Sequence, residues 1–369
     1  MANNETLYTL ALKFSKDIGD ITARKLIEAC GSASEVFSEN KEYLYKIPNI
    51  NKRAIYSLTR QSKDSLVKAE KEIEISLKKN IDIWTISDKR YPKNLRHCHD
   101  APVLLFTKGN IDINKKKILS VVGTRKMTSY GRDFCKKIIG DIKRQDLVIV
   151  SGMAYGVDIC AHEQTLNNNL LAVAILGHGL NEIYPKAHYK EAMEIAEKGL
   201  LITEFPFYTS PKRENFPKRN RIIAGISEGI VVVESPLKGG AIITADLSNS
   251  YNREVFAVPG RSTDLYSQGC NWLISKNKAN IFYSYEDMEK HLNWDCYTND
   301  NTQIKPTEIS LNKDEEDIIS LLQSKGKLQI DQIVILSKKP SHIILDIMFN
   351  LELKGLITSS PGKFFESKI

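Results

Sequence analysis

The strongest constraint on this chain is a repeating pattern between residues 117 and 281, in which short apolar runs alternate with glycine-containing turns and amphipathic stretches. The runs are rich in Val and Ile and nearly free of polar residues, as is typical of strands buried on both faces of a sheet. The amphipathic stretches, such as Gly131–Gln145 and His188–Lys198, have helical spacing. Strands that alternate with helices predict βαβ units, so we expect an α/β fold with a doubly wound, mostly parallel sheet. The predicted strands are Ile118–Val122, Leu147–Val150, Ala172–Leu176, Leu200–Thr203, Ile230–Val233 and Val255–Val258.

The N-terminal segment, residues 1–80, has a different pattern. Apolar residues recur at helical spacing between short Gly or Pro turns, which predicts a helical domain. Residues 18–26 and 47–55 are similar to each other, since each has a short turn followed by a helix that opens with basic residues. They resemble helix-hairpin-helix and sterile-alpha-motif-like modules, which suggests a backbone phosphate at a helix N-terminus. The alternative is a small helical packing domain.

Three further parts complete the predicted organisation. Strands at Ile81–Ile86 and Val103–Thr107 join the alternating region in an α/β domain over residues 81–295. Residues 296–310 are polar and predict a linker. Residues 311–369 predict three helices and a hairpin that spans 355–366, an arrangement that resembles a winged helix. The helices are expected at Asp314–Ser324, Ile330–Leu336 and Ser341–Lys354.

Glycine-containing loops follow four of the predicted strands. Ligands of open α/β sheets bind beyond the carboxyl ends of the strands, so these loops should share one edge of the sheet. Glycines let backbone N–H groups approach an anion, and helix N-termini add a favourable dipole. We therefore predict a phosphate-binding surface there, although Gly156 and Gly179 are more simply explained by close helix packing. The loops are Gly123-Thr124-Arg125, Ser151-Gly152-Met153, Gly177-His178-Gly179 and Lys238-Gly239-Gly240.

Arg125 is the most informative residue of these loops. Its guanidinium follows a buried strand and a glycine directly. A cation in such a place needs an anionic partner. Packing of the glycines does not supply one, so Arg125 points to a bound anion.

The densest basic cluster of the α/β region lies between Lys212 and Arg221, where five basic residues accompany one acidic residue. Asn215, Phe216 and Lys218 belong to it. An aromatic ring beside positive charge is what the stacking of bases and the binding of phosphates require. The alternative is a solvated basic turn in which Phe216 is part of the core.

Two arginines of this cluster, Arg219 and Arg221, lie two positions apart on a predicted helix and point about 200° from each other. Both cannot then contact the same phosphate. One of them can instead form a structural ion pair with a carboxylate such as Glu204 or Glu234.

The sequence contains no recognisable catalytic motif: there is no Gly-x-Ser-x-Gly, no Walker loop, and no Gly-x-Gly-x-x-Gly after the first strand. We expect His162 to be a packed or capping histidine, and His178 to reach a ligand without a nucleophile beside it. The run His97-Cys98-His99-Asp100 is not expected to bind a metal, because adjacent residues cannot all face one ion and zinc sites draw ligands from separate places. We therefore predict no cofactor and no metal.

Composition bears on where the protein acts. No apolar run approaches the about 20 residues that a membrane span needs, and residues 1–10 lack the apolar segment of a signal peptide. The six cysteines are scattered without a Cys-x-x-Cys pair, which is typical of reduced thiols. We expect a cytoplasmic protein with no membrane association.

Taken together, these residues resemble the DprA/Smf family, the DNA-processing protein A of bacterial natural transformation, over nearly the whole chain. The resemblance implies an extended Rossmann-like domain and a role outside catalysis. The motifs that carry it lie at 121–125, 151–158 with Ala161-His162, 176–180 with Tyr184-Pro185, 215–225, 240–245 and 253–260.

Proteins of this family bind and protect single-stranded DNA, help to displace single-strand-binding protein, load the RecA recombinase and commonly act as homodimers. By resemblance, Arg125 is the key phosphate contact, with Lys218 and either Arg219 or Arg221 in support, and Phe216 stacks on a base. The backbone at Met153 and Gly240 would contact phosphates. The full expected DNA-binding set is Gly123, Thr124, Arg125, Gly152, Met153, Asn215, Phe216, Lys218, Arg219, Arg221, Lys238, Gly239 and Gly240.

Two other function classes compete with this one. The first is a nucleotide-binding or nucleotide-hydrolysing enzyme on the related lysine-decarboxylase-like scaffold, but the loop at 237–244 lacks the catalytic Glu of those proteins. The second is a small-nucleotide sensor, which leaves Phe216 and the basic cluster unexplained. Residues 311–369 carry equal numbers of basic and acidic residues, so we do not expect them to provide duplex binding.

Overall fold

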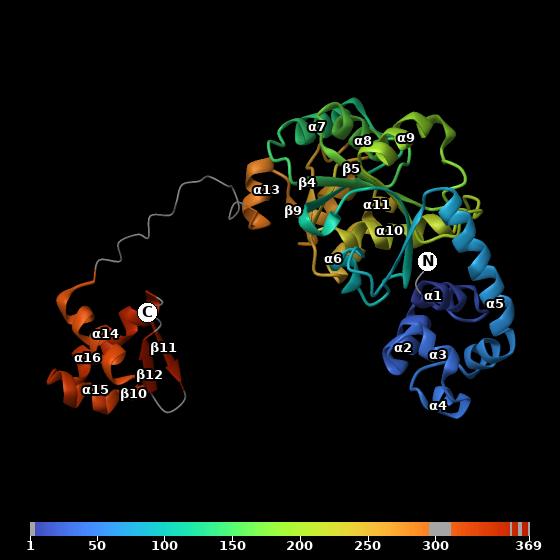
Figure 1. Cartoon of the computed structure of the whole chain (residues 1–369). Coiled ribbons are helices and arrows are strands. Elements are labelled where there is room, and N and C mark those ends of the chain that lie inside the picture. Colours follow the sequence, from blue (N-terminus) through green and yellow to red (C-terminus); the bar gives the residue numbers. More distant parts are fainter. Residues whose placement is uncertain (1–3, 295–310, 355, 361–363, 368–369) are drawn as a thin grey trace. The chain divides into compact units, whose positions relative to one another are not determined.

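The computed structural model describes residues 4–294, 311–354, 356–360 and 364–367. The chain forms two compact units, Met1–Cys296 and Tyr297–Ile369, and both are drawn in Figure 1. The linker predicted at 296–310 lies outside the described residues.

The first unit is built on a nine-stranded sheet with the order β1-β2-β6-β5-β4-β3-β7-β8-β9. Strands β6, β5, β4, β3, β7, β8 and β9 are parallel to one another. Strand β2 runs antiparallel to β6 and to β1. This confirms the mostly parallel α/β sheet and its six predicted strands. The strands are β1 (Asp82–Thr85), β2 (Leu104–Gly109), β3 (Lys117–Val122), β4 (Leu147–Ser151), β5 (Leu171–Leu176), β6 (Leu200–Thr203), β7 (Gly229–Val232), β8 (Glu254–Ala257) and β9 (Asn280–Ile281).

The chain order creates a switch point between β3 and β7. From β3 the chain continues through β4, β5 and β6 on one side, and then returns to place β7 against the other side of β3. The register pairs Ser120 with Val150 of β4 and with Ile230 of β7. The loops that follow β3 and β7 therefore leave the same edge in opposite directions, which opens a crevice between them.

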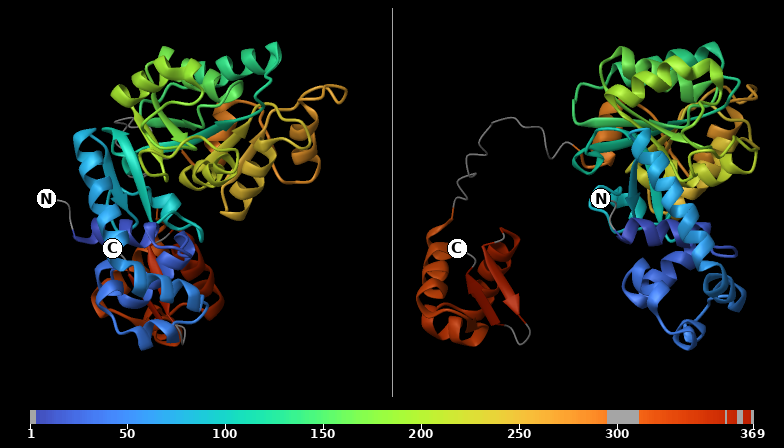
Figure 2. Two further views of the ribbon diagram at one scale, coloured as in Figure 1. Left: turned by 90° about the vertical axis from the view of Figure 1, so that its right-hand side faces the viewer. Right: turned by 45° about the vertical axis from the view of Figure 1, so that its right-hand side comes forward.

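Helices cover both faces of this sheet (Figures 1 and 2). Strand residues alternate between two cores: Leu119 and Val121 face one layer of helices, and Ile118 and Val122 face the other. The first layer contains α7 (Ser129–Gly140), α8 (Val157–Asn167), α9 (Tyr189–Lys198) and α13 (Tyr285–His291), and the second contains α6 (Lys93–Arg96), α10 (Asn215–Ile226), α11 (Gly240–Ser250) and α12 (Gln268–Ser275). Short 3₁₀ turns occur at Ile113–Lys115 and Lys186–His188.

The N-terminal helices belong to the same compact unit as the sheet. They are α1 (Asn4–Phe14), α2 (Asp20–Cys30), α3 (Ala33–Ser38), α4 (Lys41–Lys46) and α5 (Lys52–Lys78). Leu10 of α1 and Ala69 of α5 share a core with Leu104 and Phe106 of β2. Burial of these apolar side chains, at about 25 cal/mol per Å², is one attraction between the helices and the edge of the sheet.

In its described residues, the second unit has three helices and a three-stranded sheet with the order β10-β12-β11. Its core contains Ile318, Leu322, Ile333, Ile344 and Leu351, one or more from each helix. The predicted helices and hairpin are confirmed. The elements are α14 (Lys313–Lys325), β10 (Leu328–Gln329), α15 (Ile330–Ser337), α16 (Ser341–Leu353), β11 (Ile357–Ser360) and β12 (Phe364–Ser367).

Across the described residues, every helix is too short or too polar to traverse a lipid bilayer.

Candidate nucleic-acid interface

A cavity of about 650 Å³ lies at the switch point, between the loop after β3 and the loop after β7. The first turns of α10 and α11 complete its walls. It therefore occupies the place where doubly wound sheets bind ligands. Of the predicted site residues, those that line it are Gly123, Thr124, Arg125, Phe216, Arg219, Gly239 and Gly240.

Arg125 and Phe216 lie next to each other in this cavity. The guanidinium carbon of Arg125 is 5.4 Å from the centre of the Phe216 ring, which is within the range of a cation–π contact. Arg125 is exposed, and within the described residues its guanidinium makes no ion pair or hydrogen bond. The cavity thus presents an available cation beside an aromatic ring.

The glycines of the cavity divide into two kinds. A Cβ on Gly123 would lie 2.4 Å from Cγ2 of Val157, and one on Gly239 would lie 2.2 Å from Oγ of Ser235, so packing requires glycine at both positions. A Cβ on Gly240 would meet nothing within 4 Å. Gly240 is the first residue of α11, whose N-cap provides no side-chain hydrogen bond. The Ile242 N–H donates to the Gly239 carbonyl at 3.2 Å, so the first turn can offer a ligand the N–H groups of Gly240 and Ala241, which line the cavity at the positive end of the helix dipole.

The buried carboxylate of Glu234 holds the loop that carries Arg125. Thr128 donates its backbone N–H to Oε2 at 2.9 Å and its hydroxyl to Oε1 at 2.5 Å. The backbone N–H of Thr124 donates to the Glu234 carbonyl at 2.7 Å. These bonds fix both ends of the loop 124–128, so the position of Arg125 depends on Glu234.

Arg219 forms part of the cavity floor. Its side chain is buried, and its Nη1 donates hydrogen bonds to the carbonyls of Gly152 and, at 2.6 Å, of Ile175. A Cβ on Gly152 would lie 1.9 Å from this nitrogen, so Gly152 makes room for the guanidinium. Burial lowers the pKa of Arg219 to about 10, and the nearby Asp158 opposes that shift. The residue mainly supports the cavity from inside.

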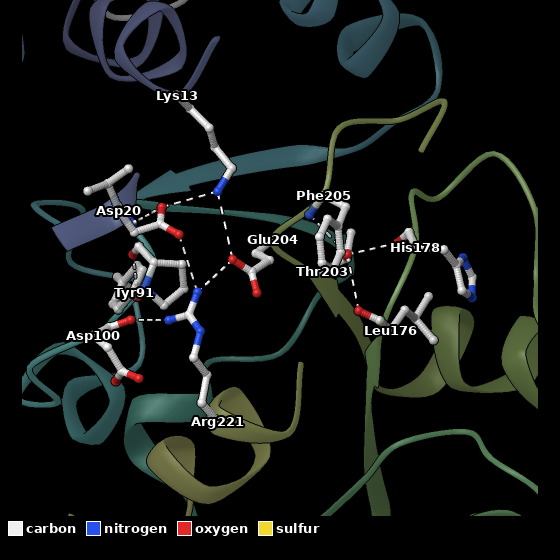
Figure 3. A network of polar contacts seen from close by, with 12 residues as sticks. Lys13, Asp20, Tyr91, Asp100, Leu176, His178, Thr203, Glu204, Phe205 and Arg221 are labelled. Atoms are coloured by element: carbon white, nitrogen blue, oxygen red, sulfur yellow. Dashed lines mark hydrogen bonds and ion pairs between the residues drawn. The ribbon is translucent and has the colours of Figure 1, made fainter. Parts of the chain in front are cut away.

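Arg221 points away from Arg219, as the predicted angle between the two arginines requires, and lies beside the carboxylates of Asp20 and Glu204 (Figure 3). Its Nη2 lies 2.6 Å from Oε2 of Glu204 and 3.2 Å from Oδ2 of Asp20, and its Nη1 donates to the Asp100 carbonyl. Lys13 lies 3.1 Å from Oδ1 of Asp20. The predicted alternative, an arginine paired with Glu204, is confirmed for Arg221, which ties the N-terminal helices to the α/β core.

Burial and the neighbouring cations shift the pKa values of the two carboxylates, Glu204 and Asp20. Burial raises the pKa of Glu204, against the attraction of Lys13 and Arg221. Burial also acts to raise the pKa of Asp20, but Lys13 and Arg221 outweigh it and the pKa of Asp20 is lowered. Asp20 therefore stays ionised and serves as the anionic partner between the two modules.

The remaining predicted residues lie outside the lining of the switch-point cavity. Asn215 and Met153 are buried, and the Met153 carbonyl bonds with Nδ1 of His188 at 2.8 Å. Lys238 is exposed on the loop before α11. Lys218 is also exposed, but it lines a second cavity of about 510 Å³, together with Arg221 and the first turn of α2. The structure therefore separates Lys218 from Phe216, although the two are only two residues apart.

Several cavity residues were missed by the sequence reasoning. Arg213, Tyr184, Asn220 and Thr244 all line the cavity. Arg213 belongs to the basic cluster and could have been found there. Tyr184 belongs to a family motif in the sequence, but only the folded chain brings its loop against Phe216 and so shows its place in the cavity.

Of the residues considered for catalysis and metal binding, His162, Cys98 and Asp100 pack against or bond with other parts of the protein. His162 is fully buried, as expected for a packed histidine, and burial lowers its pKa to about 3. Cys98 is buried against Gly225, and Asp100 accepts a hydrogen bond from the Tyr251 hydroxyl at 2.7 Å. Within the part of the chain that the structure describes, no three His, Cys, Asp or Glu residues are grouped to hold a metal ion.

The fold and the cavity define a class: a Rossmann-like α/β protein whose switch-point cavity holds an exposed arginine beside an aromatic ring. Comparison with known proteins identifies the family within this class. The model of DNA recombination-mediator protein A matches residues 82–293, and that of the DprA winged helix domain matches residues 303–363. The chain belongs to the DNA recombination-mediator protein A (DprA/Smf) family, which confirms the resemblance. This family is one of DNA-binding recombination mediators rather than of enzymes.

Individual relatives agree with this assignment. The chain is 32% identical over 319 residues to protein Smf of Escherichia coli, a match that covers 83% of each chain. It is 38% identical over 205 residues to DNA processing protein DprA of Streptococcus pneumoniae, over 56% of this chain and 72% of that protein.

Two solved structures are also similar. The X-ray structure of the Streptococcus pneumoniae protein superposes with a TM-score of 0.66 at 30% identity, over 78% of this chain and 97% of that one. DNA processing protein A of Helicobacter pylori, whose structure concerns its single-stranded DNA binding mode, gives a TM-score of 0.53 at 27% identity, over 58% and 96% of the respective chains.

Proposed function

We propose that the switch-point cavity binds single-stranded DNA and that the protein uses this binding to mediate recombination. The observation that carries the proposal is the pairing of Arg125 with Phe216. One supplies a phosphate contact and the other a surface for a base, within one cavity. The solved relative from Helicobacter pylori, described for its single-stranded DNA binding mode, supports the same conclusion.

The geometry favours a single strand over a duplex. A base can stack on a protein ring only when its face is free, and duplex bases are already stacked on each other. The N-terminus of α11, with Gly239 and Gly240 in the lining, adds backbone donors and dipole potential for a second phosphate.

The basic residues have distinct roles in this proposal. Arg125 binds a phosphate directly, and the exposed Lys238 and Lys218 attract the strand as it enters or leaves the cavity. Arg219 and Arg221 act from beneath, because their guanidinium groups already bond with Gly152, Glu204 and other groups of the protein.

RecA is the proposed downstream partner, because a recombination mediator delivers single strands to a recombinase. Displacement of single-strand-binding protein follows from the same role, since both proteins compete for one strand. We place this activity in the cytoplasm, in agreement with the five described cysteines, all of which are free thiols.

A homodimer is also proposed. β9 forms one edge of the nine-stranded sheet, and the apolar side chains of Ile281 and Tyr283 there are 51% and 80% exposed. Exposed edges and apolar side chains commonly serve as interfaces. Light scattering on the wild type and on Ile281→Lys tests this: we expect a dimer and a monomer, respectively.

The experiment for the central function is fluorescence anisotropy with labelled oligo-dT and with a duplex of the same length. We expect saturable binding of oligo-dT and at least about tenfold weaker binding of the duplex. Equal affinity for both would contradict the single-strand preference, and hydrolysis of a mononucleotide by the purified protein would instead favour the nucleotide-processing alternative.

A further inference from the structure

We propose that Tyr184 is a second base-stacking residue, which extends the aromatic surface of Phe216 so that neighbouring bases of the strand each contact a ring. This inference rests on the proposed function of the cavity and specifies how the strand is held. It assigns a role to a residue for which the sequence pattern gave none.

The first observation is the position of the Tyr184 ring. Tyr184 lines the same cavity as Arg125, and its ring centre lies 5.9 Å from that of Phe216, with the two planes inclined by 40°. The rings therefore touch at an angle and form one continuous aromatic surface. They come from different parts of the chain, since Tyr184 lies in the connection after β5 and Phe216 in the first turn of α10.

The second observation is that the Tyr184 side chain is not used by the fold. It is 45% exposed, and within the described residues its hydroxyl has no hydrogen-bond partner. Tyr130 is equally exposed, but its hydroxyl donates to the Pro259 carbonyl at 2.7 Å. A large exposed ring beside a cavity is a typical contact for a nucleic-acid base.

The third observation is that one loop, Gly177-His178-Gly179, contacts both the Tyr184 backbone and the Phe216 ring. The Tyr184 backbone N–H donates to Nε2 of the buried His178 at 3.3 Å, so this nitrogen is an acceptor and the proton is on Nδ1, which donates to the Gly179 carbonyl at 2.8 Å. A Cβ on Gly177 would lie 3.0 Å from Cδ1 of Phe216, so this ring packs directly on the glycine.

His178 is thus a positioning residue for Tyr184. The loop is tied to the sheet in turn, since Thr203 of β6 donates its hydroxyl to the His178 carbonyl at 2.8 Å (Figure 3). Rings that are fixed before binding lose little conformational freedom when a base stacks on them, which favours affinity.

Three variants test the proposal in the full-length protein: Tyr184→Leu removes the ring, Tyr184→Phe keeps it, and Tyr45→Leu is a control at a tyrosine of α4 that is 42% exposed. The probes are oligo-dT and an oligomer of the same length with abasic sites. Loss of one stacking contact should weaken oligo-dT binding at least about fivefold, which corresponds to about 1 kcal/mol. The Phe and control variants should stay within about twofold of the wild type.

The abasic oligomer separates stacking from a merely structural role. If Tyr184 contacts a base, Tyr184→Leu and the wild type bind the abasic oligomer equally. An equal loss for both oligomers, or an unchanged affinity for oligo-dT, would overturn the proposal. If the wild type itself fails to bind oligo-dT, the proposed function has failed instead.

A fluorescent variant provides a second test that does not depend on loss of binding. In Tyr184→Trp, the added indole emission should be quenched by oligo-dT and unaffected by the abasic oligomer. Binding of oligo-dT without any change in this emission would show that no base stacks at position 184.

Discussion

Replacement of Arg125 by alanine should weaken the binding of oligo-dT more than any other single loss of charge at the cavity. A hydrogen bond to a charged group contributes about 1.5–3 kcal/mol. This energy corresponds to roughly 12- to 140-fold in affinity. Because Arg125 is exposed and unpaired within the described residues, its removal leaves no buried charge, and the free energy of unfolding should change by less than about 0.5 kcal/mol.

Fluorescence anisotropy with labelled oligo-dT at fixed salt measures this effect. Arg132→Ala is the matched control, because Arg132 is an exposed arginine of α7 outside the cavity lining and its loss changes the net charge equally. We expect the control to stay within about twofold of the wild type. If both variants lose affinity equally, only net charge matters; if Arg125→Ala binds as the wild type does, the site assignment is wrong.

Three further predictions concern salt, domain and acid dependence. The logarithm of the affinity for oligo-dT should fall with the logarithm of salt concentration by about 0.7 for each neutralised phosphate, and a flat response in the same titration would favour the small-nucleotide alternative. Deletion of residues 300–369 should reduce oligo-dT affinity by less than about threefold, because the first unit is compact by itself and 311–369 carries no excess of positive charge; a large loss would show that the second unit binds the strand. Burial lowers the pKa of His162 from 6.5 to about 3, so between these pH values His162 is protonated in the unfolded chain and neutral in the folded chain. The free energy of unfolding should therefore fall as pH decreases from 6.5 towards 3. Urea unfolding at several pH values should show a weaker acid dependence for His162→Leu, and an unchanged slope would contradict the buried neutral state.

The sequence specified the sheet and the place of the cavity well. Strands such as Leu147–Ser151 are continuous runs of Val, Ile and Leu between clear turns, so their boundaries follow from local pattern. The rule that ligands bind at the carboxyl edge then placed Arg125 and Gly240 in one site before any coordinates. Both steps depend on short-range signals and on a general property of parallel sheets.

The roles of individual basic residues could not be predicted in the same way. Arg221 bonds with Asp20, which is 201 positions away, and no local pattern encodes such a pair. Lys218 and Phe216 are neighbours in the sequence, but the helix directs them into separate cavities. The helical angle predicted that Arg219 and Arg221 would diverge, but the partners of Arg221, Asp20 and Glu204, come from distant parts of the chain.

The roles of individual glycines could not be predicted from the sequence either. In the sequence, Gly152 and Gly240 have equal standing as candidates for phosphate contact. The structure distinguishes them, because a side chain at 152 would collide with the Arg219 guanidinium whereas one at 240 would enter open space. Whether a glycine serves packing or ligand approach depends on atoms from distant parts of the chain.

The most direct test of the central claim is a crystal structure of the full-length protein with a short thymidine oligomer. We predict density for the strand across the switch-point cavity, with a phosphate at the Arg125 guanidinium and a thymine stacked on the Phe216 ring. An oligomer bound elsewhere on the protein, with this cavity empty, would contradict the account.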